Sequence, residues 1–63
     1  MGEWIKCSER MPDKFVDVLV TDGVYVEVMW LDCDWYWDSW IEPWAVKVDR
    51  KNITHWMPLP KLP

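Results

Sequence analysis

The chain contains few of the residues on which small catalytic or disulfide-stapled domains depend. Its 63 residues include one histidine, two cysteines and two glycines. Secreted domains of this length usually carry several disulfides, and the sequence leaves open whether Cys7 and Cys33 pair. His55 and the two cysteines have neither the spacing nor the fourth ligand of a zinc site. We therefore expect no metal site, no cofactor and no enzymatic activity.

A long apolar run and a basic surface are also missing. No segment approaches the ~20 apolar residues of a membrane-spanning helix, and no basic stretch followed by an apolar one marks a signal peptide. Eleven acidic residues oppose seven basic ones, giving a net charge of −4. Neither Lys nor Arg occurs from Phe15 to Val46. Because binding to phosphates needs cations, we expect neither a nucleic acid partner nor a membrane partner. Because a membrane span and a signal peptide are missing, we expect a cytoplasmic location.

Tryptophan is the residue that this short chain has in excess, with seven copies in 63 residues. Ordering a chain costs about 1.5 kcal/mol per residue, which burial must offset. Each buried indole removes about 150–250 Å² from water, which contributes roughly 4–6 kcal/mol. We therefore expect most tryptophans in the core of one domain spanning residues 1–63. An aromatic platform at the surface is the alternative.

Short alternating segments separated by turn signals predict an all-β fold. No segment shows a sustained helical period, and Asp22-Gly23 is a strong hairpin signal between two valine-rich segments. Such a pattern is typical of a small antiparallel meander of four to six short strands, folded as a curled sheet or an SH3-like barrel. The expected strands cover about residues 3–6, 15–21, 24–31, 35–40, 44–48 and 53–57.

The valines favour one register for the central hairpin. A three-residue loop at residues 21–23 would pair Val18 with Val26 and keep the valines on one face. A four-residue loop at residues 31–34 would keep the tryptophans of the next strand on that same face. Together these two registers place three carboxylates side by side on the opposite face: Asp17, Glu27 and Asp38.

Both ends of the chain carry a recognisable pattern. Trp4-Ile5, Arg10-Met11-Pro12, Val18-Leu19-Val20 and the segment from His55 to Pro60 follow one order and spacing. In these features the sequence resembles the small phage- and prophage-associated domain of unknown function five-five-one, from Trp4 to Pro60. The resemblance implies a phage or prophage origin and a bacterial host cytoplasm, and it transfers no active site. Because the middle segment varies in that family, the acidic, tryptophan-rich middle is particular to this chain.

The predicted carboxylate row is the first basis for a functional hypothesis. Like charges on directly opposed strand positions destabilise a sheet by a few tenths to about 1 kcal/mol. The simplest explanation is a solvated face that keeps the protein soluble. The functional hypothesis is a non-enzymatic inhibitor whose carboxylates imitate nucleic acid phosphates. It would occupy the basic groove of a host protein, for instance in a CRISPR or restriction complex.

The exposed aromatic residues support a second hypothesis, an SH3-like module that binds a peptide or protein. The sequence leaves open the target, the oligomeric state and which tryptophans are exposed. Under the two hypotheses together, the candidate partner-binding residues are Asp17, Asp22, Glu27, Asp32, Asp34, Tyr36, Asp38, Trp40 and Glu42.

Overall fold

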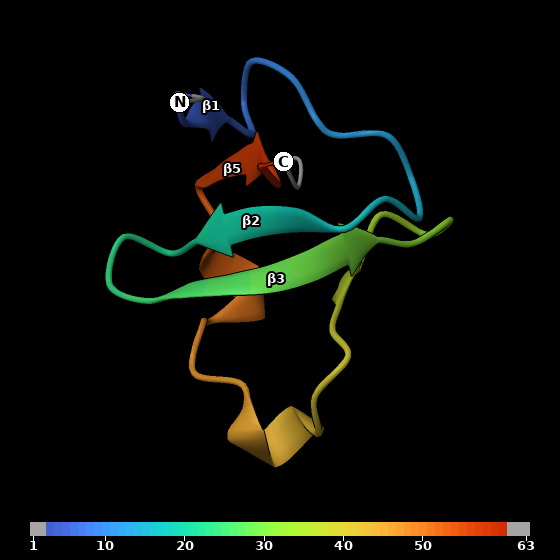
Figure 1. The fold of residues 1–63 in the computed structure, drawn as a ribbon, viewed down its shortest axis with the longest axis vertical. Helices are drawn as coiled ribbons and strands as arrows, with labels where there is room; N and C mark the ends of the chain where they lie inside the picture. The colour runs from blue at the N-terminus through green and yellow to red at the C-terminus, as the bar shows by residue number, and fades with distance from the viewer. Residues whose placement is uncertain (1–2, 61–63) are drawn as a thin grey trace.

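The computed structural model describes residues 3–60 and contains one five-stranded antiparallel sheet in the order β1-β5-β2-β3-β4 (Figure 1). Two 3-10 helices, η1 (Pro43–Ala45) and η2 (Arg50–Asn52), lie between β4 and β5. The all-β prediction is confirmed, and the sheet is curled and open rather than a closed barrel, with β1 and β4 as its edges. The strands are β1 (Ile5–Lys6), β2 (Val18–Thr21), β3 (Val26–Leu31), β4 (Trp37–Asp38) and β5 (His55–Pro58).

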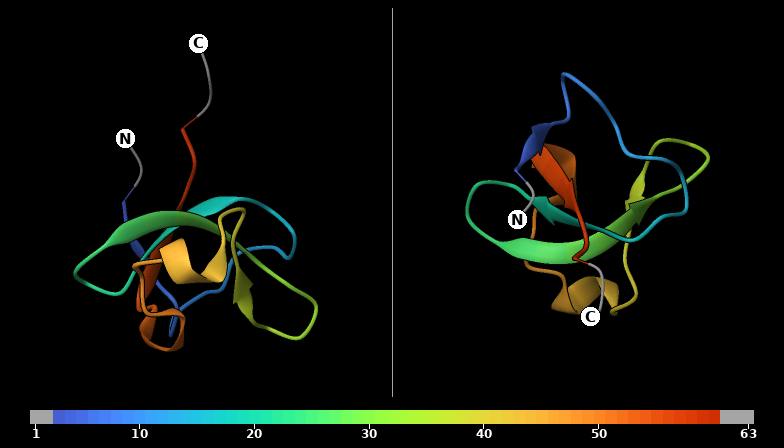
Figure 2. Two further views of the ribbon diagram at one scale, coloured as in Figure 1. Left: turned by 90° about the horizontal axis from the view of Figure 1, so that it is seen from below. Right: turned by 45° about the horizontal axis from the view of Figure 1, so that its top comes forward.

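The C-terminal strand joins the two ends of the chain to the central hairpin. β5 lies between β1 and β2, and Trp56 pairs with Ile5 on one side and with Val20 on the other. The Trp56 indole Nε1 also donates a hydrogen bond of 2.7 Å to the Arg10 carbonyl. The right view of Figure 2 shows β1 (blue) beside β5 (red), and β5 pairs with β2 along its whole length.

The core lies on one side of the sheet and is smaller than the tryptophan count predicts. Its buried residues come from β2, β3, β4 and β5, with Val48 added from the segment before η2. Only two of the seven tryptophans, Trp37 and Trp56, are buried. The expectation that most tryptophans are in the core is therefore wrong. The hydrophobic core cluster consists of Val18, Val20, Met29, Leu31, Trp37, Val48 and Trp56.

The register of the central hairpin also differs from the prediction. Val18 pairs with Met29 and Val20 with Glu27, so the predicted pairing of Val18 with Val26 is wrong. The shift of three residues reverses the faces of β3. Met29 and Leu31 are buried, whereas the valines of this segment lie outside the core. Val24, Val26 and Val28 are 77%, 53% and 38% exposed.

The turn between β2 and β3 explains this register. It is a four-residue loop at residues 22–25, in which Asp22 Oδ1 accepts hydrogen bonds from the amides of Val24 at 2.8 Å and Tyr25 at 2.9 Å. Thr21 Oγ1 accepts from the Gly23 amide at 2.9 Å and donates to the Tyr25 carbonyl at 2.8 Å. Gly23 takes the positive φ of 95° that the loop requires. Side-chain capping by Asp22 and Thr21, rather than valine pairing, sets the alignment.

The β3–β4 connection follows the same principle. Leu31 pairs with Trp37, which leaves a five-residue loop instead of the predicted four. Asp32 Oδ1 accepts from the amides of Asp34 at 2.8 Å and Tyr36 at 2.9 Å. Trp35 occupies a left-handed conformation with φ of 65°. The loop is therefore organised by an aspartate that bonds to backbone amides ahead of it in the chain.

Two other predicted strands have different outcomes. The strand expected at residues 44–48 is absent, because Pro43 begins η1 there and residues 39–49 form an arm that extends from the sheet (Figures 1 and 2). The strand expected at residues 53–57 is present as β5, where Pro58 pairs with Val18 at its last position. Between these two segments lies η2, whose N-cap is Asp49, with its side chain accepting a hydrogen bond from the Lys51 amide.

The register can be tested by comparing two adjacent β3 residues. Met29→Ala should lower the free energy of unfolding by about 2–5 kcal/mol, since Met29 is fully buried. Val28→Ala should cost no more than about 1 kcal/mol, because that side chain is 38% exposed on the other face. Urea denaturation of both variants measures the difference. An equal loss in the two variants would contradict the observed register.

Candidate functional site

The side of the sheet opposite the core is apolar, and we call it the outer face. Its central row consists of Met57, Leu19 and Val28, which pair directly across β5, β2 and β3. Val26 and Trp30 extend this row along β3 by strand alternation. The five side chains are half-buried or exposed although all are apolar. Because large exposed apolar patches mark interaction sites in many proteins, the outer face is the candidate site.

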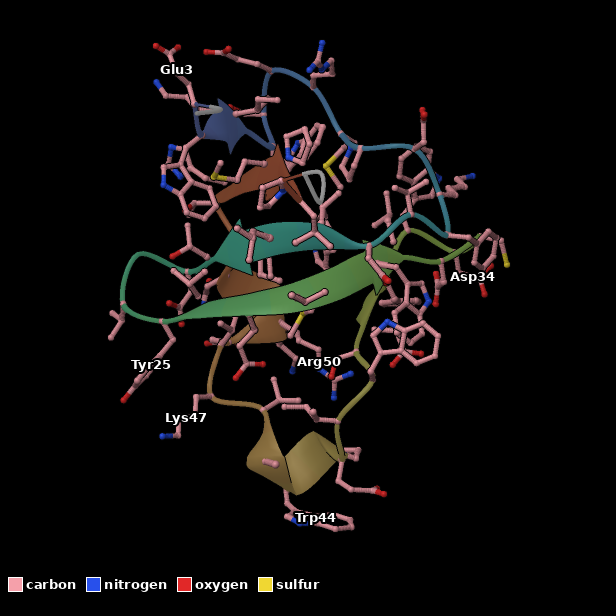
Figure 3. The ribbon with its side chains drawn as sticks, viewed as in Figure 1. Glu3, Tyr25, Asp34, Trp44, Lys47 and Arg50 are labelled. Carbon is pink, nitrogen blue, oxygen red and sulfur yellow. The ribbon has the colours of Figure 1, made fainter. Side chains whose placement is uncertain are left out.

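The outer face is accessible along β2 and β3, because η2 lies behind these two strands (Figure 1). In Figure 1 it is turned toward the viewer, and η2 passes behind β2 and β3. The left view of Figure 2 places η2 on the far side of that hairpin. Figure 3 shows Trp44 at the end of the arm, pointing away from the strands, where it is 83% exposed. The end of the arm therefore lies away from the outer face, whereas Trp40 at its start packs on Trp30.

The predicted row of three carboxylates does not form. Asp38 pairs with Trp30 on the outer face, and Asp17 lies beside them because its Oδ1 accepts a hydrogen bond of 2.8 Å from Trp40 Nε1. Glu27 pairs with Val20 and therefore points to the core side. The error follows directly from the predicted register, which was wrong by three residues in each hairpin. Two carboxylates, not three, remain at this end of the outer face.

Glu27 has a structural contact on the core side. Its Oε1 accepts a hydrogen bond of 2.9 Å from the Lys47 amide, which ties the arm to β3. Its Oε2 is buried and has no hydrogen-bond partner. An unpaired buried carboxylate oxygen is unfavourable, so this tether stabilises the arm only weakly. Glu27 is not available to a partner on the outer face.

Asp22 and Asp32, also predicted to bind a partner, accept backbone hydrogen bonds. Besides the two amides of its own turn, Asp22 accepts the Asp49 amide at 3.0 Å through Oδ2. The backbone N–H groups of Asp49, Tyr25 and Val24 together lower the pKa of Asp22 from 3.8 to about 2. Asp32 caps its own loop as described above. These two carboxylates therefore stabilise the turns within the fold.

The remaining predicted residues do not gather at one place. Tyr36, 71% exposed, lines a hollow of about 430 Å³ that also contains Asp38, Arg50 and Lys51. The opposite charges in that hollow define no ligand class. Asp34 is exposed in the β3–β4 loop, as Figure 3 shows, and Glu42 is exposed before η1. Of the nine predicted residues, only Asp17, Asp38 and Trp40 lie at the outer face.

One pocket lies at the acidic end of the outer face, and we call it the aromatic pocket. It has a volume of about 310 Å³ and is lined by Phe15, Asp17, Trp30 and Trp40. The rings of Trp30 and Trp40 meet at 4.7 Å between centroids, tilted by 53°. Sequence reasoning identified Asp17 and Trp40 but missed Phe15 and Trp30, as well as the apolar row. Assigning Asp22 as a turn cap would have placed Trp30 and Val28 on the outer face, because it changes the face of every β3 residue, whereas the position of Phe15 has no such signal in the sequence.

A second hollow brings Cys7 and His55 together with Ser8, in a volume of about 310 Å³. Burial raises the pKa of the Cys7 thiol above its ordinary value of 9.0, so the reactive thiolate is scarce at neutral pH. His55 Nδ1 is 2.8 Å from Thr54 Oγ1. Cys7 and Cys33 are both free thiols. This combination does not have the lowered thiol pKa that a cysteine nucleophile requires.

Within residues 3–60, no three His, Cys, Asp or Glu side chains come together as a metal site would require. Across the same residues, no helix has the length and apolar character needed to cross a bilayer.

The fold and the site define a class of small all-β domains that have a core on one side of the sheet and exposed aromatic residues on the other. The chain belongs to the family described as "Protein of unknown function (DUF551)", which matches residues 3–63. It is also similar to the "Uncharacterized 7.8 kDa protein in ral-gp17 intergenic region" of Salmonella phage P22, with 38% identity over 69 residues, 97% of this chain and 96% of that protein. No solved structure matches the chain. The resemblance noted from the sequence is confirmed, and the chain is a small phage-associated protein.

The Asp22 carboxylate should produce a distinct acid dependence of stability. Its pKa is lowered on folding, so its contribution is complete above about pH 4 and is lost as the pH falls toward 2. Asp22→Asn should lower the melting temperature at pH 7. Between pH 4 and pH 2 its melting temperature should fall by less than that of the wild-type protein. Thermal unfolding followed by circular dichroism measures both effects. As a control, Asp34→Asn removes the same charge from an exposed loop position, and its melting temperature should fall between pH 4 and pH 2 as steeply as that of the wild type. An equally steep fall in Asp22→Asn would contradict the role of Asp22.

Proposed function

We propose that this phage-associated protein is a non-enzymatic binding module that docks its outer face on a host protein in the bacterial cytoplasm. The observation that carries the proposal is the apolar row of Met57, Leu19 and Val28, which lies opposite the core, with Val28 exposed and the other two half-buried. Burying such a row supplies the apolar centre of a protein interface. The aromatic residues at its end are of the type enriched at interface hot spots.

The charges around the outer face give a docked partner an orientation. Asp17 and Asp38 lie at the end formed by β3 and β4, whereas Lys6 and His55 pair with each other at the β1 end. A partner with a basic group at one end and an acidic group at the other complements this pattern. The net charge of −4 would speed the approach of a basic partner.

Nucleic acid mimicry of a host defence complex, such as a CRISPR or restriction enzyme, has weaker support than the binding module. That hypothesis needs a row of carboxylates with the spacing of phosphates. Glu27 faces the core and bonds to the Lys47 amide, while Asp22 and Asp32 are occupied by backbone amides. Lys6 lies on the same face as the two remaining acids. An apolar, mixed-charge face fits a protein surface better than a phosphate-binding groove.

The proposal can be tested by replacing two valines in different places with lysine. Val28→Lys puts a cation in the centre of the outer face, whereas Val24→Lys puts one in the β2–β3 loop, where the side chain is 77% exposed. Immobilised wild-type protein and both variants are incubated with lysate of a bacterial host, and the captured proteins are identified by mass spectrometry. Val28→Lys should lose the partner by tenfold or more, and Val24→Lys should retain it.

Circular dichroism spectra establish that both variants are folded before capture. Equal capture by Val28→Lys and wild type would rule out the outer face as the docking surface. If capture instead disappears in about 0.5 M salt and is displaced by DNA, the nucleic acid mimic is the correct alternative.

A further inference from the structure

The aromatic pocket has the composition of a cation-binding site. Three of its four lining residues, Phe15, Trp30 and Trp40, are aromatic, and the fourth is a carboxylate, Asp17. Aromatic rings present negative electrostatic potential on their faces, and a carboxylate adds a full negative charge. Such a combination favours a positively charged group that has an apolar stem, and it disfavours an anion.

Two contacts fix the Trp40 ring although the residue is 73% exposed. Its indole Nε1 donates to Asp17 Oδ1 at 2.8 Å, and its ring packs on Trp30 at a centroid distance of 4.7 Å. The hydrogen bond occupies one oxygen of Asp17, which leaves Oδ2 for a ligand. An exposed tryptophan held in place before binding loses little conformational freedom when a partner arrives.

Phe15 is held at the pocket by an unusual backbone conformation. Its φ is 61°, in the left-handed region that β-carbon-bearing residues rarely adopt, and its side chain is 65% exposed. The Phe15 amide donates to the Leu31 carbonyl at 2.8 Å, which locks the conformation against β3. Strained residues that the surrounding structure enforces are concentrated at binding sites. Here the strain keeps a large apolar ring at the surface beside Asp17.

No Lys or Arg of residues 3–60 lines the aromatic pocket. The chain contains no Lys or Arg from Phe15 to Val46, and the adjacent Lys14 is engaged elsewhere, with its Nζ 4.3 Å from the centroid of the Trp35 ring. Arg10 likewise lies 5.7 Å from the Trp56 ring. Within residues 3–60 the protein thus pairs a cation with an indole at two places, while the aromatic pocket is lined by a carboxylate and no cation.

We infer that the aromatic pocket binds a single lysine or arginine side chain of the partner protein. The alkyl stem of that side chain lies against Phe15 and Trp30, and its charged end contacts the Trp40 ring and the free oxygen of Asp17. The identity of the partner rests on the proposed function, whereas cation binding by the pocket can be measured without it. Docking the apolar row and inserting one cation at its acidic end would fix both position and direction of the partner.

The test is a titration of the ¹⁵N-labelled protein with capped single residues, followed through the indole N–H resonances of Trp30 and Trp40. N-acetyl-lysine methylamide and N-acetyl-arginine methylamide are the cationic probes, and N-acetyl-norleucine methylamide is the neutral one. The cationic probes should shift both resonances in a saturable manner, and norleucine should shift them by less than a third as much. The stronger of the two cations identifies the preferred side chain.

Three variants assign the effect to the pocket. Asp17→Asn keeps an oxygen acceptor for Trp40 but removes the charge, and it should weaken cation binding by roughly three- to tenfold. Trp40→Phe keeps a ring but removes the N–H donor, and it should weaken binding through loss of the preorganised geometry. Glu3→Gln, at the opposite edge of the sheet beyond β1, removes an equal charge and should leave the titration unchanged.

Equal shifts with norleucine and lysine, or an Asp17→Asn titration identical to wild type, would overturn the cation assignment. A cation-binding pocket with capture insensitive to Val28→Lys would leave the pocket standing and refute the outer-face proposal. Capture that is lost in Val28→Lys, together with no response to the cationic probes, would support the outer-face proposal and refute cation binding by the aromatic pocket. The two failures are therefore distinguishable.

Discussion

The carboxylate of Asp22 is the interaction on which the arrangement of the sheet depends. It accepts amides from Val24 and Tyr25 within the turn and from Asp49 across the molecule. The first two bonds define a four-residue loop and so determine which β3 residues face the core. The third attaches the start of η2 to the same point, which places Val48 over the sheet. One side chain thereby couples the register of β2 and β3 to the closure of the core.

Alternation and turn signals were sufficient to predict the all-β class, the central hairpin and both terminal strands, because these features are local. They were insufficient for the register, since valines at residues 24, 26 and 28 match a core stripe as well as an exposed one. The choice depends on how Asp22 and Thr21 cap the turn, which involves bonds to residues up to four positions ahead. Trp44 and Val46 were misread as a strand for a related reason, because alternation carries no information about Pro43 initiating a 3-10 turn.

The candidate site was only partly predictable for the same physical cause. Asp17 and Trp40 were identified from charge and aromatic character, yet their direct hydrogen bond joins residues 23 positions apart. Phe15 and Trp30 were assigned to strands or core, because neither a positive φ nor a half-buried indole can be deduced from the sequence. The acidic residues divide into those that bond to the backbone and those that stay at the surface. Only the structure separates the two groups.

The brevity of the edge strands has a consequence for the way in which any partner can attach. β1 and β4 contain two residues each, so neither edge offers the run of free amides and carbonyls on which an added strand is built. Further copies of the chain therefore cannot extend the sheet by pairing with its edge strands, although the outer face is apolar. A partner of the kind proposed above would therefore contact the side chains of the outer face and not the strand edges.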